Sequence, residues 1–268
     1  MTDAVFRKLV LGYYRKHGRH DLPWRKRITP YRVLVSEIML QQTQVPRVIE
    51  KYRSFLKLFP SFRALARAST ADVIKAWQGL GYNRRALALQ RCAYAVVAHH
   101  HGKLPTDYET LLSLPGIGPY TARAVLAFAH DIPVAMIETN IRRVYLHHYF
   151  ADQQGVADAK LLPLIERHVR QVGSARIWQS ALMDYGTHLA TTVTNPNRRS
   201  KHYTRQAVFA GSLRQLRGSI VRHVTTLGRV SRVELTRRTG DSRTGLAIMA
   251  LQREGFLHVV KGVVTLPR

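Results

Sequence analysis

TPYRVLVSEIMLQQTQV, residues 29–45, is expected to form one helix. Thr29 can cap it, and Pro30 suits the first helical position, where a missing N–H costs nothing. Apolar side chains at positions 33, 34 and 40 surround Glu37 at helical spacing. Burial on such a face disfavours the charged carboxylate and raises the pKa of Glu37, which suits a general acid. The helix alone leaves a second interpretation open, a buried carboxylate in a structural ion pair.

The composition is that of a globular and strongly basic chain. Its 268 residues are enough for one to three domains, and 46% of them are hydrophobic. Lys and Arg together number 42 against 16 acidic residues, which gives a formal charge of +26. An excess of this size indicates a polyanionic partner, and we expect nucleic acid.

Cysteine usage and hydropathy exclude several other classes of protein. Cys92 is the only cysteine, so neither a disulfide nor a cysteine-ligated metal centre can form within the chain. No apolar run approaches the roughly 20 residues that cross a bilayer, and the N-terminus MTDAVFRKLV lacks a signal-peptide core. We therefore expect a cytoplasmic, nucleoid-associated monomer with no membrane partner.

The apolar spacing is helical up to residue 208, and no segment alternates for long enough to form a strand. We expect an all-α domain over residues 1–208, built as two helical lobes, about 23–133 and 1–22 plus 134–208. The polar, basic segment 195–206 (NPNRRSKHYTRQ) is expected to be a linker.

Residues 209–268 have a different character. Three helical segments are followed by FLHVV and VVTL, which flank Lys261-Gly262, a turn that suits a β-hairpin. This order predicts a small winged-helix-like α+β domain, in which the third helix or the wing often meets DNA. Basic residues favour such a contact, while a protein-contact module stays open: Arg237, Arg238, Arg243 and Lys261.

Besides the start at Thr29, four helix starts are predicted from capping residues. They are the capping boxes Ser69–Asp72, Thr106–Glu109 and Ser231–Glu234, and a single cap at Ser242.

LPGIGPY, residues 114–120, is the most specific local signal. Gly116 and Gly118 allow a tight turn with close backbone approach, and the next helix would offer unpaired N–H groups and its positive dipole end. A helix-hairpin-helix of this kind holds a DNA phosphate without reading sequence. An ordinary turn between helices is the alternative. Backbone carbonyls of such a hairpin could also hold a monovalent cation.

A second carboxylate, Glu138, lies in VAMIETNIRRV, residues 134–144. It directly precedes a helix that carries Asn140, Arg142 and Arg143. Taken alone, it fits a carboxylate that complements the dipole at a helix start.

Five motifs occur in one order and at consistent intervals. They are LPWR (22–25), TPYRVLVSEIMLQQTQV (29–45), GLGYNRRA (79–86), LPGIGPYTARAV (114–125) and IETNIRRV (137–144). Over about residues 5–190 the chain resembles the helix-hairpin-helix DNA glycosylases, and within them the MutY-type adenine glycosylases.

The resemblance implies catalytic roles. Glu37 would protonate the flipped base, at N7 of adenine, and help to position the attacking water. Glu138 stands where the family has an Asp that stabilises the oxocarbenium-like sugar, and Asn140 matches a nearby Asn; one carboxyl group must be protonated and the other charged. Tyr120 stands where strand-cleaving relatives carry a nucleophilic Lys, which implies a monofunctional enzyme. Trp24 and Tyr120 would line the base pocket.

The resemblance also implies contacts with double-stranded DNA. Gln42 and Tyr82 match the wedge residues that fill the gap left by the flipped base and touch the opposite base. Backbone contacts are expected from the hairpin glycines and from three arginines: Arg25, Arg84 and Arg142.

The chain departs from the family in three ways. Ala190 stands where most relatives have the first of four iron–sulfur cysteines and no cysteine follows, so no cluster is expected; nearby basic residues would replace its role in DNA contact by charge. Glu138 is longer than Asp by roughly 1.5 Å, and misplacements of about 1 Å can cost on the order of 100-fold in rate. The family's C-terminal domain, which inspects 8-oxoguanine, is not recognisable.

These observations predict a monofunctional base-excision DNA glycosylase that hydrolyses the N-glycosidic bond of adenine opposite 8-oxoguanine or guanine. A thymine/uracil mismatch glycosylase is the enzymatic alternative. A lesion- or mismatch-binding protein without catalysis is the alternative from another class.

Overall fold

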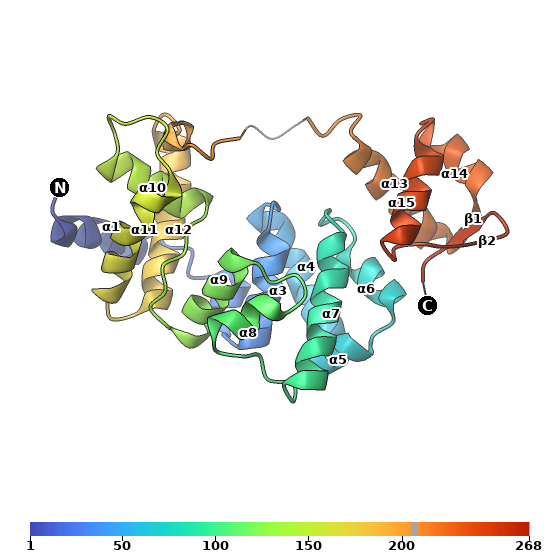
Figure 1. The fold of residues 1–268 in the computed structure, drawn as a ribbon, viewed down its shortest axis with the longest axis horizontal. Coiled ribbons are helices and arrows are strands. Elements are labelled where there is room, and N and C mark those ends of the chain that lie inside the picture. Colours follow the sequence, from blue (N-terminus) through green and yellow to red (C-terminus); the bar gives the residue numbers. More distant parts are fainter. Residues whose placement is uncertain (205–207, 268) are drawn as a thin grey trace. The chain divides into compact units, whose positions relative to one another are not determined.

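The computed structural model describes residues 1–204 and 208–267, and this part of the chain is helical apart from three short strands near its end (Figure 1). It forms two compact units, Met1–Glu37 with Leu104–Arg205, and Ile38–Lys103 with Gln206–Arg268. The division falls within one helix, directly after Glu37. These units do not test the lobe and domain boundaries expected from the sequence, which stay a prediction. No described helix has the length and apolar character needed to span a bilayer.

An apolar core joins the first, ninth, tenth, eleventh and twelfth helices of the chain, all in the first unit. Phe6, Tyr145 and Trp178 are fully buried there, and the rings of Tyr145 and Trp178 both meet the Phe6 ring edge-on. The core therefore ties together the first, tenth and twelfth helices. The elements of this unit are α1 (Asp3–His17), α2 (Pro23–Lys26), α3 (Pro30–Leu40, shared with the second unit), α8 (Tyr108–Ser113), α9 (Pro119–His130), α10 (Thr139–Tyr149), α11 (Asp158–Arg170), α12 (Ala175–Thr192) and the 3-10 helix η1 (Pro196–Arg199).

The second unit holds the middle helices and all three strands. Its elements are α4 (Val45–Leu58), α5 (Phe62–Arg67), α6 (Thr70–Trp77), α7 (Arg84–His99), α13 (Leu213–Leu227), β1 (Arg229–Ser231), α14 (Arg232–Thr239), α15 (Thr244–Arg253), β2 (His258–Val260) and β3 (Val263–Thr265).

The C-terminal part of the second unit has the winged-helix order of elements that the sequence predicted, with one addition. The predicted turn at Lys261-Gly262 joins β2 to β3, and both residues adopt positive φ, 46° and 76°. β1 was not predicted; it pairs with β3, so the antiparallel sheet has the order β1-β3-β2. β1 has three residues, which is too short for an alternating apolar pattern to be recognised in the sequence.

The helix that carries Glu37 is shorter than predicted. α3 ends at Leu40 rather than at residue 45, and the backbone of Gln42 turns into the left-handed region with φ 53°. The guanidinium of Arg85 donates hydrogen bonds to backbone carbonyl groups at the end of this helix, to Ile38 at 2.8 Å and to Met39 at 2.9 Å. Because their partner lies more than 40 residues away, the sequence of the helix gives no sign of this end.

Two of the four predicted helix caps are present and two are wrong. The hydroxyl groups of Ser69 and Ser231 each accept a hydrogen bond from the N–H three residues on, at 3.1 Å. α8, however, is capped by Asp107, whose carboxylate accepts from Thr110 N–H at 2.8 Å, and not by Thr106. α15 begins at Thr244 after Arg243, so Ser242 does not cap it.

The first half of the expected linker, Asn195–Ser200, is packed structure. η1 begins there, capped by the side chain of Asn195, and Ser200 forms a parallel bridge with Val156. Asn197 is 6% exposed and donates to the Thr139 carbonyl at 3.0 Å. These side-chain contacts hold the segment against the start of α10, although its composition is that of a loop. The last two residues of the expected linker, Arg205 and Gln206, lie outside the described residues.

Candidate active site

Glu37 lies on the apolar face of α3 and is 7% exposed, with Val33 and Leu34 buried beside it. Burial raises the pKa of Glu37 to about 7, which is the direction expected from the sequence. A hydrogen bond from Tyr120 lowers this pKa and the negative charge of Glu138 raises it. Near neutral pH a large fraction of the Glu37 carboxyl groups therefore holds a proton, as a general acid requires.

Tyr120 is the second residue of α9, and its phenolic O–H donates to Oε2 of Glu37 at 3.1 Å. Burial raises the pKa of Tyr120 well above its ordinary value, and the charges of Glu37 and Glu138 act in the same direction. The phenol thus stays protonated and keeps its role as a donor. This hydrogen bond fixes the orientation of the Glu37 carboxyl group.

Glu138 is the N-cap residue of α10, and its side chain is the cap. Oε1 accepts from the N–H groups of Asn140 at 2.7 Å and Ile141 at 2.8 Å. Burial raises the pKa of Glu138, while those two N–H groups and the charge of Arg143 favour the carboxylate. The helix start therefore holds the Glu138 carboxyl group in place, close enough to Glu37 for its charge to raise the pKa of Glu37.

A second layer of contacts orients Asn140 beside Glu138. The Nδ2 group of Asn140 donates to Oε2 of Glu138 at 3.3 Å, and its Oδ1 accepts from Arg143 at 2.7 Å. Arg143, which is 8% exposed, also donates to the Gly186 carbonyl at 2.7 Å. A Cβ on Gly186 would lie 2.4 Å from the Asn140 carbonyl oxygen, so only glycine permits this approach of α12 to α10.

The first unit thus brings together Glu37, Tyr120, Glu138 and Asn140, four of the residues that the sequence singled out. The Glu37 carboxyl group is buried and readily protonated, whereas the Glu138 carboxyl group accepts hydrogen bonds from two backbone N–H groups. Two carboxyl groups in such different environments can act as an acid and as a stabilising anion at the same pH.

Trp24 and Arg25 are neighbours on α2, and both side chains are largely buried. Trp24 is 8% exposed. Arg25 donates to the two carboxylate oxygens of Asp184 at 2.7 and 3.1 Å, and Arg19 binds the same carboxylate at 2.6 Å. Although burial acts to raise the pKa of Asp184, the two arginines hold it below its ordinary value. Arg25 therefore anchors α2 to α12 through a buried ion pair.

The hairpin before α9 has the geometry expected of a phosphate site. Gly116 adopts φ 79°, a conformation that other residues rarely take. Gly118 is the N-cap of α9; it is exposed, it provides no side-chain cap, and a Cβ there would meet no atom within 4 Å. The 12-residue helix thus begins beside open space, and no side chain caps the positive end of its dipole.

The two expected wedge residues lie in the second unit, and both adopt left-handed backbone conformations. Gln42 is exposed with φ 53°, and Tyr82 is half-buried with φ 45°. Arg85 connects their turns, donating to the carbonyls of Gln41 at 2.5 Å, Gly81 at 2.9 Å and Tyr82 at 3.3 Å. One guanidinium therefore fixes both strained turns relative to each other.

The three arginines expected to contact the DNA backbone all have carboxylate partners. Arg25 is bound to Asp184, Arg84 to Glu254 and Arg142 to Asp158, with closest distances of 2.7, 2.5 and 2.7 Å. Arg84 remains 73% exposed, whereas Arg25 and Arg142 are 15% and 18% exposed. The sequence did not reveal these partners, and they give Arg25 and Arg142 structural roles.

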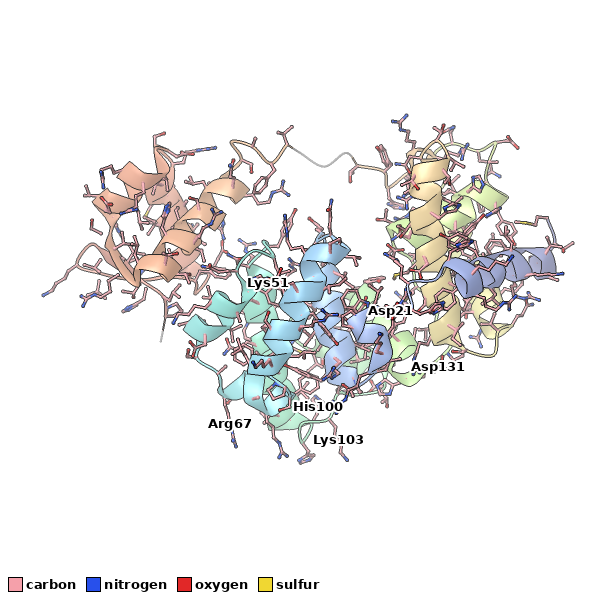
Figure 2. The ribbon with its side chains drawn as sticks, turned by 180° about the vertical axis from the view of Figure 1, so that it is seen from behind. Asp21, Lys51, Arg67, His100, Lys103 and Asp131 are labelled. Carbon is pink, nitrogen blue, oxygen red and sulfur yellow. The ribbon has the colours of Figure 1, made fainter. Side chains whose placement is uncertain are left out.

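Other basic side chains of the second unit are exposed, among them Arg67 and Lys103, which Figure 2 labels.

The described residues do not supply the side chains of an iron–sulfur cluster or of a metal centre held by His, Cys, Asp or Glu. The single cysteine, Cys92, is fully buried in α7. Among residues 1–204 and 208–267, no group of three or more His, Cys, Asp or Glu side chains is placed to hold a metal ion. The segment after Ala190, where the resemblance implies the cluster of most relatives, includes the packed residues around Asn197.

The structure adds Asp184 and Gly186, which sequence reasoning left without a role in the site, and it gives Arg85, a candidate for DNA-backbone contact from the sequence, a structural role. Asp184 anchors α2, Gly186 permits the close approach to Asn140, and Arg85 holds the two turns. A glycine within a helix costs about 1 kcal/mol relative to alanine, and this was the one signal for Gly186. Asp184 and Arg85 gave no signal of these contacts, because their partners are far away in the sequence.

Comparisons with known proteins agree with this geometry. Residues 35–167 match the model of the family described as HhH-GPD superfamily base excision DNA repair protein. The adenine DNA glycosylase of Mycolicibacterium smegmatis is 38% identical over 183 residues, which cover 68% of this chain and 62% of the relative. The thymine/uracil-DNA glycosylase of Pyrobaculum aerophilum is 39% identical over 140 residues, 52% of this chain and 61% of the relative. The chain thus spans less than two thirds of either relative's length.

A solved structure is also similar. A thermostable thymine-DNA glycosylase aligns with a TM-score of 0.63 and 27% identity, covering 74% of this chain and 90% of that one. The fold is therefore the expected one, mostly helical with a small C-terminal sheet. Through these matches the chain belongs to the HhH-GPD superfamily of base excision DNA repair proteins.

Proposed function

We propose that this protein is a monofunctional DNA glycosylase that removes adenine mispaired with 8-oxoguanine or guanine from double-stranded DNA. One observation carries the proposal: a buried carboxyl group with a pKa of about 7, oriented by Tyr120 and placed beside the capped carboxylate of Glu138. The relative in Mycolicibacterium smegmatis, named an adenine DNA glycosylase, supports adenine as the base.

The proposed reaction divides the work between the two carboxyl groups. Glu37 donates its proton to a ring nitrogen of the flipped base, and the C–N glycosidic bond breaks with its electron pair leaving on the base. The sugar becomes an oxocarbenium-like cation, which the Glu138 carboxylate stabilises. Water then adds to the sugar carbon and gives its proton to the Glu37 carboxylate, which restores the acid and leaves an abasic site.

Tyr120 supports the monofunctional part of the proposal. Strand cleavage by a glycosylase of this kind needs an amine that forms a Schiff base with the sugar. The side chain that stands in that place is a phenol whose pKa is raised well above its ordinary value and whose O–H group donates to Glu37. We therefore infer that the reaction ends at the abasic site.

DNA is bound, in this proposal, through the backbone and by deformation. The uncovered end of α9 holds a phosphate, Gln42 and Tyr82 enter the duplex where the base leaves, and exposed basic side chains neutralise further phosphates. Bending and unstacking cost a few kcal/mol, which such contacts offset. A monovalent cation at the hairpin and an association with the nucleoid both stay predictions.

A thymine/uracil mismatch glycosylase is the second candidate, because relatives with those names match the chain. The two are separated by incubating the protein with duplexes that carry A:8-oxoG, A:G, T:G or U:G, followed by alkali to reveal abasic sites. Glu37→Gln is the matched control, since the amide keeps its oxygen as an acceptor for Tyr120. Binding without excision of any base would leave the third candidate, a non-catalytic mismatch-binding protein. Strand breaks without alkali would contradict the monofunctional proposal.

A further inference from the structure

The C-terminal domain, residues 208–267, packs against the middle helices within the second unit. Ile74 of α6 and Leu87 of α7 belong to the same buried apolar cluster as Leu216, Leu251 and Phe256 of that domain. Because these side chains are at most 7% exposed, the domain is docked through its core and not through a few surface contacts.

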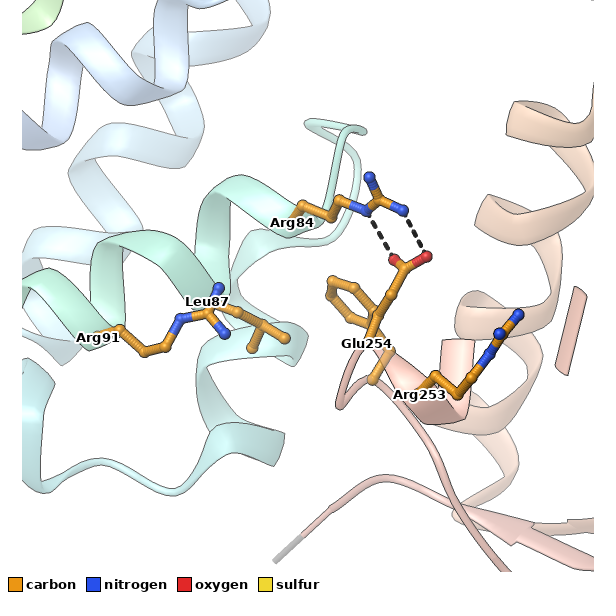
Figure 3. Close-up of a pocket in the computed structure, with 6 residues that line it drawn as sticks. Arg84, Leu87, Arg91, Arg253 and Glu254 are labelled. Carbon is orange, nitrogen blue, oxygen red and sulfur yellow. Dashed lines mark hydrogen bonds and ion pairs between the residues drawn. The ribbon is translucent and has the colours of Figure 1, made fainter. Parts of the chain in front are cut away.

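Glu254 adds an ionic link at the edge of this apolar contact. Its carboxylate accepts from Arg84 at 2.8 and 2.5 Å and is also paired with Arg217 of α13. Figure 3 shows Arg84 of α7 meeting Glu254, with Leu87 nearby, at a pocket of about 240 Å³. The two arginines lower the pKa of Glu254 to about 2, so the link is intact across the physiological pH range.

A third arginine reaches the turn that carries Tyr82. Arg214 lies three residues before Arg217, on the same side of α13. It donates to the hydroxyl of Tyr82, and its guanidinium lies 5.3 Å from the centre of the Tyr82 ring. Arg85 lies 5.5 Å from the centre of the same ring and donates to the Tyr82 carbonyl. A tyrosine in a left-handed conformation is thus held at its ring, its hydroxyl and its backbone.

The contacts that dock the C-terminal domain differ from the contacts that Arg214 makes with Tyr82. Docking of the domain rests on the apolar cluster and on Glu254, neither of which needs Arg214. The two contacts of Arg214 that are described for Tyr82 act on the ring and hydroxyl, the parts of the residue that would enter a duplex. A side chain that inserts into a base stack loses less entropy when its orientation is fixed beforehand.

We propose that Arg214 is a positioning residue for Tyr82, through which the C-terminal domain sets how strongly the protein prefers mispaired over paired DNA. The inference rests on the proposed function, in which Tyr82 enters the duplex. It gives the domain a role in specificity that requires neither the third helix nor the wing to contact DNA.

The test compares Arg214→Gln, Tyr82→Phe and the double variant in the full-length chain. Two quantities are measured: the ratio of dissociation constants for paired and A:8-oxoG duplexes, and the fluorescence of 2-aminopurine placed beside the mispair, which reports unstacking. Each single variant is expected to lower the ratio about tenfold, the effect of a lost charged contact worth about 1.4 kcal/mol. The double variant should lower it no further than Arg214→Gln does, because Tyr82→Phe removes only the hydroxyl group that accepts from Arg214.

Arg222→Gln is the matched control. Arg222 is exposed on the same helix and has no side-chain partner within the described residues, so this variant should behave as the unchanged protein does. Equal melting temperatures of all variants would show that the domain stays docked. A ratio and fluorescence signal unchanged in Arg214→Gln would overturn the proposal, as would effects of Arg214→Gln and Tyr82→Phe that multiply.

Neither readout requires excision. A protein that binds and unstacks the duplex without cleaving the glycosidic bond would refute the proposed glycosylase while leaving this test decisive. Normal excision combined with unchanged discrimination in Arg214→Gln would refute only the role of Arg214.

Discussion

Glu37→Gln should make the protein more stable, and the gain should grow with pH. The carboxyl group has an ordinary pKa of 4.5 when the chain is unfolded and a pKa of about 7 in the folded protein. Between these values the folded state holds a proton that the unfolded state has lost, so stability falls as pH rises. At 1.36 kcal/mol per pKa unit, the full loss above pH 7 is about 3 kcal/mol.

The amide variant has no proton to lose and keeps the acceptor for Tyr120, so it removes this pH dependence. The difference in unfolding free energy between Glu37→Gln and the unchanged protein should grow by about 2.5 kcal/mol from about pH 5 to about pH 8. Urea titrations followed by tryptophan fluorescence measure it, since Trp24 and Trp178 lie in the same unit as Glu37. The titrations of groups that do not interact with Glu37 cancel in the difference.

Glu50→Gln is the control, because Glu50 is an exposed carboxylate on α4. Its stability difference from the unchanged protein should stay within about 0.5 kcal/mol at both pH values. If Glu37→Gln shows an equally flat difference, Glu37 is not held protonated by burial, and the assignment of the general acid loses its physical basis.

Three further substitutions test the surroundings of the site. Glu138→Gln should keep the helix cap through its amide oxygen but lower single-turnover excision about 100- to 1,000-fold, because the neutral amide does not stabilise a developing cation; near-normal excision would exclude the role. Gly186→Ala forces a Cβ to 2.4 Å from the Asn140 carbonyl and should cost about 1 to 3 kcal/mol in a urea titration, with a matching fall in excision. Arg85→Met leaves several carbonyls of the α3 end without a donor and should cost about 2 to 4 kcal/mol, whereas an unchanged midpoint would show that those bonds contribute little.

The sequence predicted the parts of the site that depend on local pattern. The apolar spacing around Glu37 placed it on a buried face, and the glycines at 116 and 118 located the hairpin. Two capping boxes were found from side chains three residues apart. Each of these features is determined by residues within one or two helical turns.

The parts that the sequence did not predict depend on partners far along the chain. α3 ends at Leu40, where the guanidinium of Arg85 binds the backbone carbonyl groups of the last turn. Arg25 is paired with Asp184, which lies 159 residues later in the chain. The segment around Asn197 packs because its amide reaches Thr139, 58 residues earlier. A polar or basic residue gives no local sign of such a partner, so the sequence did not reveal the ion pairs of Arg25, Arg84 and Arg142.

The most direct test of the central claim is the pH dependence of single-turnover excision from an A:8-oxoG duplex. If buried Glu37 is the general acid, the rate should be nearly constant below about pH 6 and fall about tenfold for each pH unit well above pH 7, and Glu37→Gln should show no excision across the range. A rate that is flat from about pH 6 to about pH 9, or measurable excision by Glu37→Gln, would contradict the account.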